Sequence, residues 1–278
     1  MSGDTPSFES LRVTHHGRVA EVELIGPGKG NAMGPAFWRE MPIAFAALDA
    51  DPAVRAVVLR GAGRGFSVGL DLMGMGAELA ELLLHGPRLA ADRVRLHATI
   101  RRMQQAISSV ADCSKPVIAA IHGWCIGGGV DLATACDVRL CSDDAKLSVR
   151  EVKLAIVADV GTLQRLPTIV GQGVARELAL TGDDVDATRA LRIGLVSHSY
   201  PTHDELFVAA RAMAERIAQN PPLAVQGTKR VLEEGMRRSI EDGLRHVALH
   251  NSAFLPSEDL AEAIGAFGAK REPTFQGR

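Results

Sequence analysis

Three acidic residues in the middle of the chain, Asp131, Glu151 and Asp159, stand among apolar neighbours. Burying an acid among apolar groups costs free energy unless the acid has partners. Buried carboxylates that lie close together also push their pKa values apart, so that one accepts a proton and another donates one near neutral pH. For any single acid of the three, a surface charge or a helix cap is the commoner role. The occurrence of all three acids together with a glycine-rich turn is what indicates proton-transfer chemistry.

Two glycine-rich stretches, residues 60–71 and 121–131, each follow an apolar run. Neither contains the G-x-G-x-x-G of a dinucleotide site, because Phe66 occupies the place of the third glycine, and neither continues into the Lys-Ser/Thr of a phosphate-binding loop. The three glycines at 127–129 precede a helical pattern, whose first amides lack an intrahelical partner and lie at the positive end of the helix dipole. Such amides stabilise an oxygen that becomes negative during a reaction. A tight, closely packed turn would use the glycines equally well, so both interpretations remain open at this point.

Alternating strand and helix patterns provide the framework that must position these residues. Strand patterns cover residues 18–25, 54–59 and 116–121, and weaker ones cover 138–141, 146–149 and 195–199. Helical patterns cover residues 37–49 and 89–110, and from residue 203 onward the pattern is almost entirely helical, with breaks at 220–222 and 255–257. The sequence therefore predicts an α/β core over residues 1–200 and a helical region over residues 201–278.

Composition excludes several classes of function. The chain has 278 residues, of which 46% are hydrophobic, and its 31 basic and 33 acidic residues give a formal net charge of −2. This balance predicts no nucleic-acid partner and no anionic-membrane surface, and no apolar run approaches the roughly 20 residues that cross a bilayer. His246 and His250 are four residues apart, but no glutamate follows His246, so the zinc-protease pattern is absent and we expect no metal. His122, beside a glycine turn, is interpreted as a packed histidine.

The cysteines and the two ends of the sequence give information about the cellular compartment of the protein. Cys113, Cys125, Cys136 and Cys141 lie in or beside apolar segments without a C-x-x-C pair, which favours buried thiols over disulfides. The first residues, MSGDTPSFESLRV, lack the features of a secretory signal or a transit peptide, and the final TFQGR is not a peroxisomal tripeptide. We therefore expect a cytoplasmic protein.

Two segments of the glycine stretches resemble a known family. Phe66-Ser-Val-Gly-Leu-Asp71 and Ile126-Gly-Gly-Gly-Val-Asp131 are similar to the paired signatures of the crotonase (enoyl-CoA hydratase/isomerase) superfamily, and residues 122–139 and 157–167 resemble its Δ3,5-Δ2,4-dienoyl-CoA isomerase branch. The resemblance runs from about residue 31 to residue 273. It implies a crotonase-like α/β spiral of ββα units, with a C-terminal helical region that drives assembly to a homotrimer, often to a dimer of trimers.

The resemblance also implies roles for individual residues. The amides of Leu70 and Gly128 would form an oxyanion hole for the thioester oxygen. The residue matching Asp159 would remove a proton from C2, the one matching Glu151 would deliver a proton to C6, and the one matching Asp131 would tune the site. The spacing of eight residues between Glu151 and Asp159 agrees with that branch.

Binding of the CoA moiety is implied for two further places. These are the backbone near Asn31 and Ala32, and an aromatic and a lysine of the C-terminal helix, here Phe267 and Lys270. No separate cofactor is implied, because coenzyme A is part of the acyl-CoA substrate.

Three functions remain open at this stage. The favoured one is isomerisation of 3,5-dienoyl-CoA to 2,4-dienoyl-CoA, a reaction of fatty acid β-oxidation. The alternative is an enoyl-CoA hydratase, whose superfamily members carry glutamates at the positions matching Asp131 and Glu151. The third is a non-catalytic acyl-CoA-binding protein, against which the retention of all three acids argues.

Overall fold

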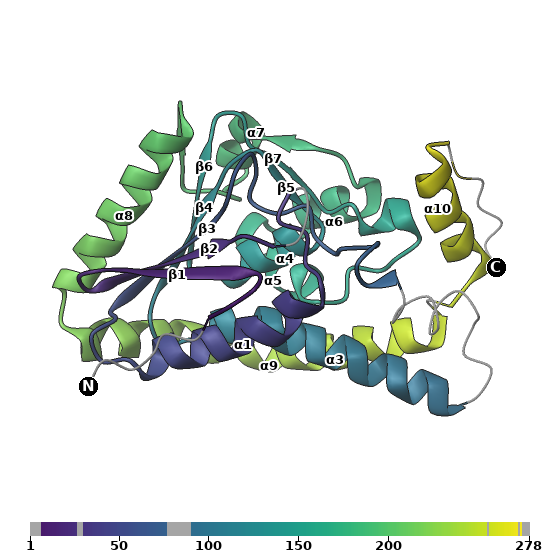
Figure 1. Ribbon diagram of the computed structural model, residues 1–278, viewed down its shortest axis with the longest axis horizontal. Helices are drawn as coiled ribbons and strands as arrows, with labels where there is room; N and C mark the ends of the chain where they lie inside the picture. Colours follow the sequence, from purple (N-terminus) through teal and green to yellow (C-terminus); the bar gives the residue numbers. More distant parts are fainter. Residues whose placement is uncertain (1–6, 27–29, 77–89, 255, 272, 274–278) are drawn as a thin grey trace.

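The architecture is taken from a computed structural model, which describes residues 7–26, 30–76, 90–254, 256–271 and 273 (Figure 1). At some positions of helix α9 (Pro222–Phe254) and a few elsewhere only the backbone is described, and the side chains of His246 and His250 are among those outside the described part. None of the helices in these ranges is long and apolar enough to cross a membrane.

The main sheet has six strands in the order β1-β2-β3-β4-β6-β9. β1 pairs with β2 in antiparallel fashion, and all the other neighbours are parallel. The strands are β1 (Leu11–His16), β2 (Val19–Leu24), β3 (Ala56–Gly61), β4 (Val117–Ile121), β6 (Val138–Ser142) and β9 (His198–Tyr200). A sheet that is parallel in its interior needs cover on both faces, which explains why β3 and β4 are apolar almost throughout.

Helices cover the two faces of this sheet (Figure 1). Side chains alternate between the faces, so Val57 and Leu59 of β3 join one buried cluster while Ala56 and Val58 join the other. The first cluster contains residues of α1 (Pro35–Ala50), α3 (Ala90–Asp112) and α4 (Gly128–Ala135). The second contains the apolar face of α8 (His203–Gln219), which therefore shares a core with the sheet.

A smaller sheet and several short helices carry the glycine turn and the acids. β5 (Trp124–Ile126) runs parallel to β7 (Lys146–Ser148), and β7 is antiparallel to β8 (Val185–Asp186). The short 3-10 helix η2 (Glu151–Leu154) follows β7. The remaining helices are α5 (Thr162–Val170), α6 (Gln172–Thr181), α7 (Ala187–Arg192), α9 (Pro222–Phe254) and α10 (Glu258–Ala269).

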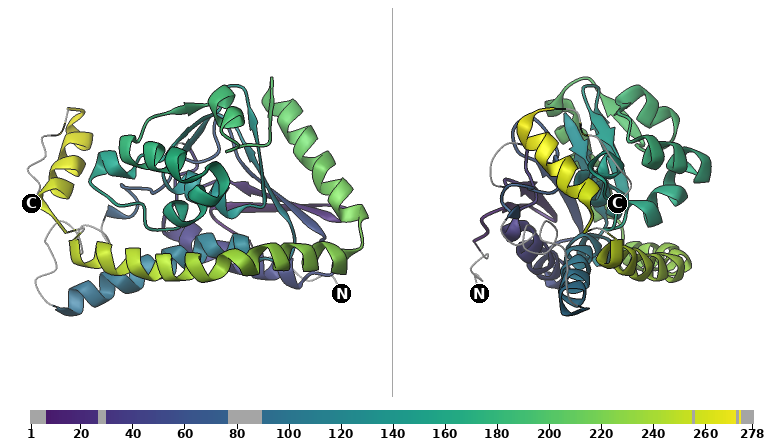
Figure 2. Two further views of the ribbon diagram at one scale, coloured as in Figure 1. Left: turned by 180° about the vertical axis from the view of Figure 1, so that it is seen from behind. Right: turned by 90° about the vertical axis from the view of Figure 1, so that its right-hand side faces the viewer.

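The C-terminal helices begin and end where the sequence predicts. The predicted breaks at residues 220–222 and 255–257 separate α8, α9 and α10. Ser257 caps α10 by accepting a hydrogen bond from the amide of Leu260 at 3.1 Å, as its residue type predicts. α9 lies alongside α3 for much of its length (Figure 2). The assignment of residues 201–278 to oligomerisation stays a prediction.

One predicted strand is shorter than expected. A strand was expected over residues 195–199, but β9 begins at His198. The amides of Leu195 and Val196 donate instead to the carbonyl of Ala190, which folds this segment into a turn after α7. Leu195 and Val196 are buried by that turn, so their apolar character has a cause other than strand formation.

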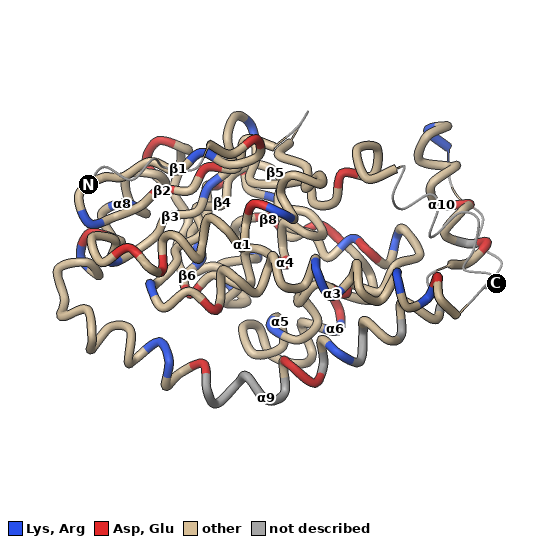
Figure 3. The backbone as a smooth tube through the Cα atoms, turned by 60° about the horizontal axis from the view of Figure 1, so that its bottom comes forward, with Lys and Arg blue, Asp and Glu red and all other residues tan. Residues whose placement is uncertain are grey.

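Charges of both signs are distributed along the described backbone (Figure 3). All four cysteines are free and buried, as their apolar surroundings predict. Burial raises the pKa of the Cys136 and Cys141 thiols to about 12, so these thiols are neutral at physiological pH.

Candidate active site

The two glycine-rich turns are in contact. The amide of Ser67 donates to the carbonyl of Trp124 at 3.0 Å, and the amide of Ile126 donates to the carbonyl of Ser67 at 2.9 Å. Gly69 has a φ of +81°, and a Cβ there would lie 2.7 Å from the carbonyl oxygen of Ile126 and 2.9 Å from the amide nitrogen of Gly128. Only glycine permits this approach, so the sequence of the turns is what brings their amides together.

Two of these amides are free donors. The bridge between Met33 and Leu70 uses the carbonyl of Gly69 and the amide of Asp71, which directs the Leu70 amide away from Met33. Gly128 is the first residue of α4, so its amide has no intrahelical acceptor. A Cβ on Gly128 would lie 3.7 Å from the nitrogen of Leu70. Within the described part of the chain neither amide donates a hydrogen bond, which leaves both available to one ligand oxygen.

The three acids gather beside this pair of amides. Asp131, in the first turn of α4, has no exposed surface, and its Oδ1 accepts a hydrogen bond from the amide of Thr162 at 2.5 Å. Glu151 begins η2, and its Oε1 would lie 3.3 Å from a Cβ placed on Gly127. Glu151 and Asp159 are half-buried as whole residues, whereas their carboxyl groups are deeply buried.

Two of the carboxylate oxygens have no hydrogen-bond partner among the described residues. They are Oδ2 of Asp131 and Oε2 of Glu151, and both are enclosed. A buried polar atom without a partner costs free energy, and such atoms are rare in native proteins. A bound molecule that supplies a partner, or a proton shared between the acids, would remove that cost.

Burial is the largest cause of the raised pKa values of all three acids. It raises the pKa of Glu151 to about 8, helped by the charge of Asp131. It raises the pKa of Asp159 to about 7 against a hydrogen bond from Asn251 that lowers it. It raises the pKa of Asp131 to about 6, while the hydrogen bond from Thr162 lowers that value. At pH 7 Glu151 is therefore mainly protonated and Asp131 is mainly ionised. The degree of protonation of Asp159 lies between those of the other two acids.

This arrangement can move protons next to a polarised carbonyl. One acid holds a proton and another accepts one at the same pH, as general acid–base catalysis requires. The two free amides offer a site for the oxygen that becomes negative during such a transfer.

Comparison with known proteins identifies the family of this chain. The sequence pattern described as enoyl-CoA hydratase/isomerase matches residues 14–278. The chain belongs to the enoyl-CoA hydratase/isomerase family. It is 45% identical to the mitochondrial Δ(3,5)-Δ(2,4)-dienoyl-CoA isomerase of Dictyostelium discoideum, over 98% of this chain and 96% of that protein. It is 45% identical to the peroxisomal enzyme of the same name from Arabidopsis thaliana, over 97% of this chain and 96% of that protein.

Solved structures of this family have the same fold. An enoyl-CoA hydratase/isomerase from Mycobacterium paratuberculosis superposes with a TM-score of 0.82 at 29% identity, covering 95% of this chain and 99% of that chain. A putative enoyl-CoA hydratase from Streptomyces coelicolor A3(2) gives a TM-score of 0.76 at 34% identity, covering 100% of this chain and 98% of that chain. The predicted crotonase-like α/β fold with its C-terminal helical region is confirmed.

The expected cytoplasmic location is wrong. The relatives of this enoyl-CoA hydratase/isomerase family member are named as mitochondrial in Dictyostelium discoideum and Homo sapiens, and as peroxisomal in Arabidopsis thaliana. The expectation depended in part on short terminal patterns, and targeting signals of that kind are addresses that receptors read.

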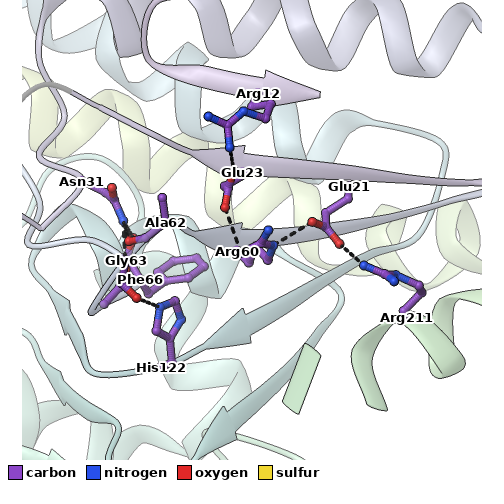
Figure 4. Close-up of polar contacts among 11 residues, drawn as sticks. Arg12, Glu21, Glu23, Asn31, Arg60, Ala62, Gly63, Phe66, His122 and Arg211 are labelled. Atoms are coloured by element: carbon purple, nitrogen blue, oxygen red, sulfur yellow. Dashed lines mark hydrogen bonds and ion pairs between the residues drawn. The ribbon is translucent and has the colours of Figure 1, made fainter. Parts of the chain in front are cut away.

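The four residues predicted to bind CoA lie in two places. Asn31 has a φ of +53°, and its side-chain amide donates to the carbonyls of Ala62 and Gly65 at 2.9 and 2.8 Å, so the side chain braces the first glycine turn (Figure 4). Ala32 follows it and is half-buried. Phe267, 60% exposed, and the exposed Lys270 lie at the end of α10. Their role in CoA binding stays a prediction.

His122 is a packed histidine, as predicted. It has no exposed surface, and its Nε2 lies 3.2 Å from the carbonyl oxygen of Gly63 (Figure 4). Its ring packs edge-on against Phe207 at 5.2 Å between centroids. Burial lowers the pKa of this imidazole, so it is neutral at pH 7.

Sequence reasoning missed the residues that hold the acids in place. The side chain of Asn251, on α9, donates to Asp159, and the side chain of Gln104, on α3, donates to the Asp159 backbone. The available signal was a polar residue in an apolar helical stripe, since Gln104 stands between the buried Ile100 and Ile107. That signal marks a buried polar group without saying what it contacts.

Proposed function

We propose that this protein isomerises 3,5-dienoyl-CoA thioesters to 2,4-dienoyl-CoA thioesters. The observation that carries the proposal is the gathering of three buried carboxylates, Asp131, Glu151 and Asp159, with pKa values raised to about 6, 8 and 7, beside two free amides. The names of the relatives support it, because proteins that are 43–45% identical over at least 97% of the chain are called dienoyl-CoA isomerases.

The proposed reaction begins at the thioester. Its carbonyl oxygen accepts hydrogen bonds from the amides of Leu70 and Gly128, which stabilise the negative charge that develops on it. The ionised carboxylate of Asp159 then takes a proton from C2. The electron pair of that C–H bond becomes delocalised over the carbonyl and the conjugated carbons.

Protonation at C6 completes the reaction. Glu151 gives its proton to C6, so the double bonds move from C3=C4 and C5=C6 to C2=C3 and C4=C5. One proton is removed and one is added, and no cofactor is consumed. Asp131 stays ionised, and its negative charge helps to keep Glu151 protonated until that step.

Hydration of a 2-enoyl-CoA is the alternative function. Solved structures related to this chain at 29–34% identity are named enoyl-CoA hydratases, as in Bacillus anthracis and Streptomyces coelicolor A3(2). We favour isomerisation because a third acid, Asp159, lies with the other two. Water addition needs one acid–base pair, whereas double-bond migration needs a base and an acid that reach two separate carbons.

A spectroscopic assay separates the two functions. Incubation of the protein with a 3,5-dienoyl-CoA is expected to produce the ultraviolet absorbance of a conjugated 2,4-dienoyl thioester. The parallel assay follows loss of the absorbance of a 2-enoyl-CoA on hydration. Rapid hydration without formation of the conjugated product would contradict the proposal. Binding of both thioesters without turnover of either would point to a non-catalytic acyl-CoA-binding protein.

The CoA moiety and the assembly complete the proposal. The backbone near Asn31 and Ala32, and the side chains of Phe267 and Lys270, contact the CoA moiety. Residues 1–200 form the core with the acyl-CoA site, and residues 201–278 drive assembly to a homotrimer or a dimer of trimers. Several large apolar side chains of α9 are exposed in the single chain, including Leu223, Val231 and Leu249, which supports an assembly role. Sedimentation analysis measures the assembly directly.

A further inference from the structure

The carboxylate of Asp159 is held from the C-terminal helical region. The side-chain amide of Asn251, on α9, donates a 2.5 Å hydrogen bond to Oδ2 of Asp159 and a 2.9 Å hydrogen bond to the carbonyl of Val157. Asn251 follows Asp159 by 92 residues and is only 2% exposed. We propose that Asn251 is a positioning residue that orients the Asp159 carboxylate for proton abstraction, so that α9 completes the active site. This inference depends on the proposed isomerase function.

The orientation of the Asn251 amide is determined by its partners. Both contacts are acceptors, a backbone carbonyl and a carboxylate oxygen, and only the NH2 group of an asparagine donates. Its two N–H bonds therefore serve Val157 and Asp159 at the same time. Because one acceptor is backbone, the Asn251 side chain is anchored independently of the Asp159 side chain that it holds.

A second amide fixes the backbone of the same loop. The Nε2 atom of Gln104, on α3, donates to the carbonyl of Asp159 at 2.6 Å and to the carbonyl of Leu244 at 3.0 Å. Leu244, Ala248 and Asn251 are spaced by four and three residues, so they share one face of α9. Ala248 on that face packs in a buried cluster with residues of α3. The loop before α5 is thus tied to both helices.

A neutral donor suits a residue that must accept a proton near neutral pH. A lysine or arginine in place of Asn251 would hold the Asp159 pKa low and make the carboxylate a weak base. An apolar residue would leave burial unopposed and keep the carboxyl protonated. The amide fixes Oδ2, and no other side chain in the described part of the chain donates to the Asp159 carboxylate, which leaves Oδ1 to take the proton.

The test is the pH dependence of kcat/KM for isomerisation of a 3,5-dienoyl-CoA by the full-length protein. In Asn251→Ala the ionised form of Asp159 loses a hydrogen bond, so its pKa rises and the acidic limb of the profile moves to higher pH. We expect a shift of about one pH unit, which from a pKa of about 7 is about a fivefold loss at pH 7 that recovers as the pH rises. We expect KM to change by less than about twofold, because Asn251 does not contact the thioester in this scheme.

Two further variants make the result specific. Asn251→Asp, which preserves the shape of the side chain, places a second carboxylate against Asp159 and should move the acidic limb further than Asn251→Ala does. Asn251→Asp also replaces Asn251→Ala as the test variant if the alanine variant folds poorly. Ser252→Ala is the matched control, because Ser252 is buried on the same helix and, among the described residues, its hydroxyl donates to the Leu249 carbonyl of α9 itself. Its profile should equal that of the wild type.

Two results would overturn the inference. One is a loss in Asn251→Ala that is uniform at every pH, which would indicate a structural role alone. The other is an unchanged profile. A measurement without turnover separates this inference from the proposed function: infrared titration of protein labelled with 13C-aspartate, in which the Asp159 band is the one absent from Asp159→Asn. A raised Asp159 pKa in Asn251→Ala with no isomerisation by the wild type would retain the positioning role and reject the isomerase. An unchanged Asp159 pKa would reject the positioning role.

Discussion

Two groups of carboxylates in this molecule have opposite surroundings. On the main sheet, Glu21 accepts hydrogen bonds from Arg60 at 2.7 Å and from Arg211 at 2.9 Å, and Glu23 forms ion pairs with Arg12 and Arg60 (Figure 4). Burial alone would raise the pKa of Glu21, but the hydrogen bonds from Arg211 and Arg60 outweigh burial and bring the pKa below its usual range. Glu21 is therefore a permanent charge at neutral pH.

The acids of the candidate site have neutral donors instead. Asp131 is held by a backbone amide and Asp159 by the Asn251 side chain. Arg165 lies near enough to lower the pKa of Asp131, but its hydrogen bond in the described region goes to Ser108 at 3.2 Å. Burial consequently dominates, and the pKa values rise toward neutrality. The comparison shows that the charge of the hydrogen-bond donor decides whether a buried acid stays ionised at neutral pH or can exchange a proton.

The largest expected effect comes from removing the proton acceptor. Asp159→Asn retains an oxygen that accepts the Asn251 hydrogen bond but cannot take a proton from C2, so kcat should fall by about 10²–10⁴-fold. Binding of a 2,4-dienoyl-CoA product, measured by calorimetry, should be retained. Glu21→Gln is the control from the other group, and its kcat should stay close to that of the wild type. A kcat for Asp159→Asn within a few-fold of the wild-type value would show that Asp159, despite its raised pKa, is not the catalytic base.

The next effect tests whether the acids need the two amides. Gly69→Ala would place a Cβ 2.9 Å from the amide nitrogen of Gly128, which forces the two turns apart. Loss of oxyanion stabilisation should lower kcat by about 10²–10³-fold. Gly63→Ala is a matched control, since Gly63 also has a positive φ, +67°, but a Cβ there would have no neighbour within 4 Å. Equal kcat values for the two variants would contradict a role for the amides.

A smaller effect concerns stability at the candidate site. Because folding raises the pKa of Asp159, the folded state binds a proton more tightly than the unfolded state, and wild-type stability falls as the pH rises from about 4 through about 7. Asp159→Asn lacks this penalty. Its free energy of unfolding should exceed that of the wild type at pH 8 by on the order of 2 kcal/mol, with the gap narrowing at pH 5. Urea titrations at the two pH values measure this gap, and a gap that widens toward pH 5 would contradict the raised pKa.

The smallest effect has the opposite pH dependence. Folding lowers the pKa of Glu21, so its contribution is present at neutral pH and is lost as the pH falls through the folded-state pKa. Glu21→Gln should cost about 1 kcal/mol of unfolding free energy at pH 7, a modest figure because Arg211 is partly exposed to solvent. The difference should shrink toward pH 4 in the same urea titrations. A constant difference across this range would mean that packing, not charge, is what the variant disturbs.

Those parts of the site that depend on backbone conformation could be predicted from the local sequence. The contact between the glycine turns follows from residues with no Cβ, and Asp131 lies at the start of a helix because the glycines precede a strong helical pattern. The positions of the long apolar strands and helices of the core followed from hydrophobic periodicity, which reports burial directly, but β1, β5 and β8 were not predicted. The turn at Leu195 shows the limit, because an apolar pair is buried equally well by a turn as by a strand.

Partners distant in the chain could not be read from local patterns. The donor to Asp159 is Asn251, and the donor to Glu21 from outside the sheet is Arg211, 190 residues away. Which donor an acid receives depends on how α8 and α9 pack, and packing is a property of the whole fold. The sequence therefore predicted where the acids are, but not which of them remains charged.

The most direct test of the central claim follows the proton itself. The protein, in excess and equilibrated in D2O, is mixed with a 3,5-dienoyl-CoA for a single turnover, and the product is analysed by mass spectrometry and NMR. If Asp159 removes the C2 proton and Glu151 supplies a different one, the 2,4-dienoyl-CoA product carries one deuterium at C6. A product without deuterium at C6 would mean that a single group carries the same proton from C2 to C6, and would contradict the division of roles between the two acids.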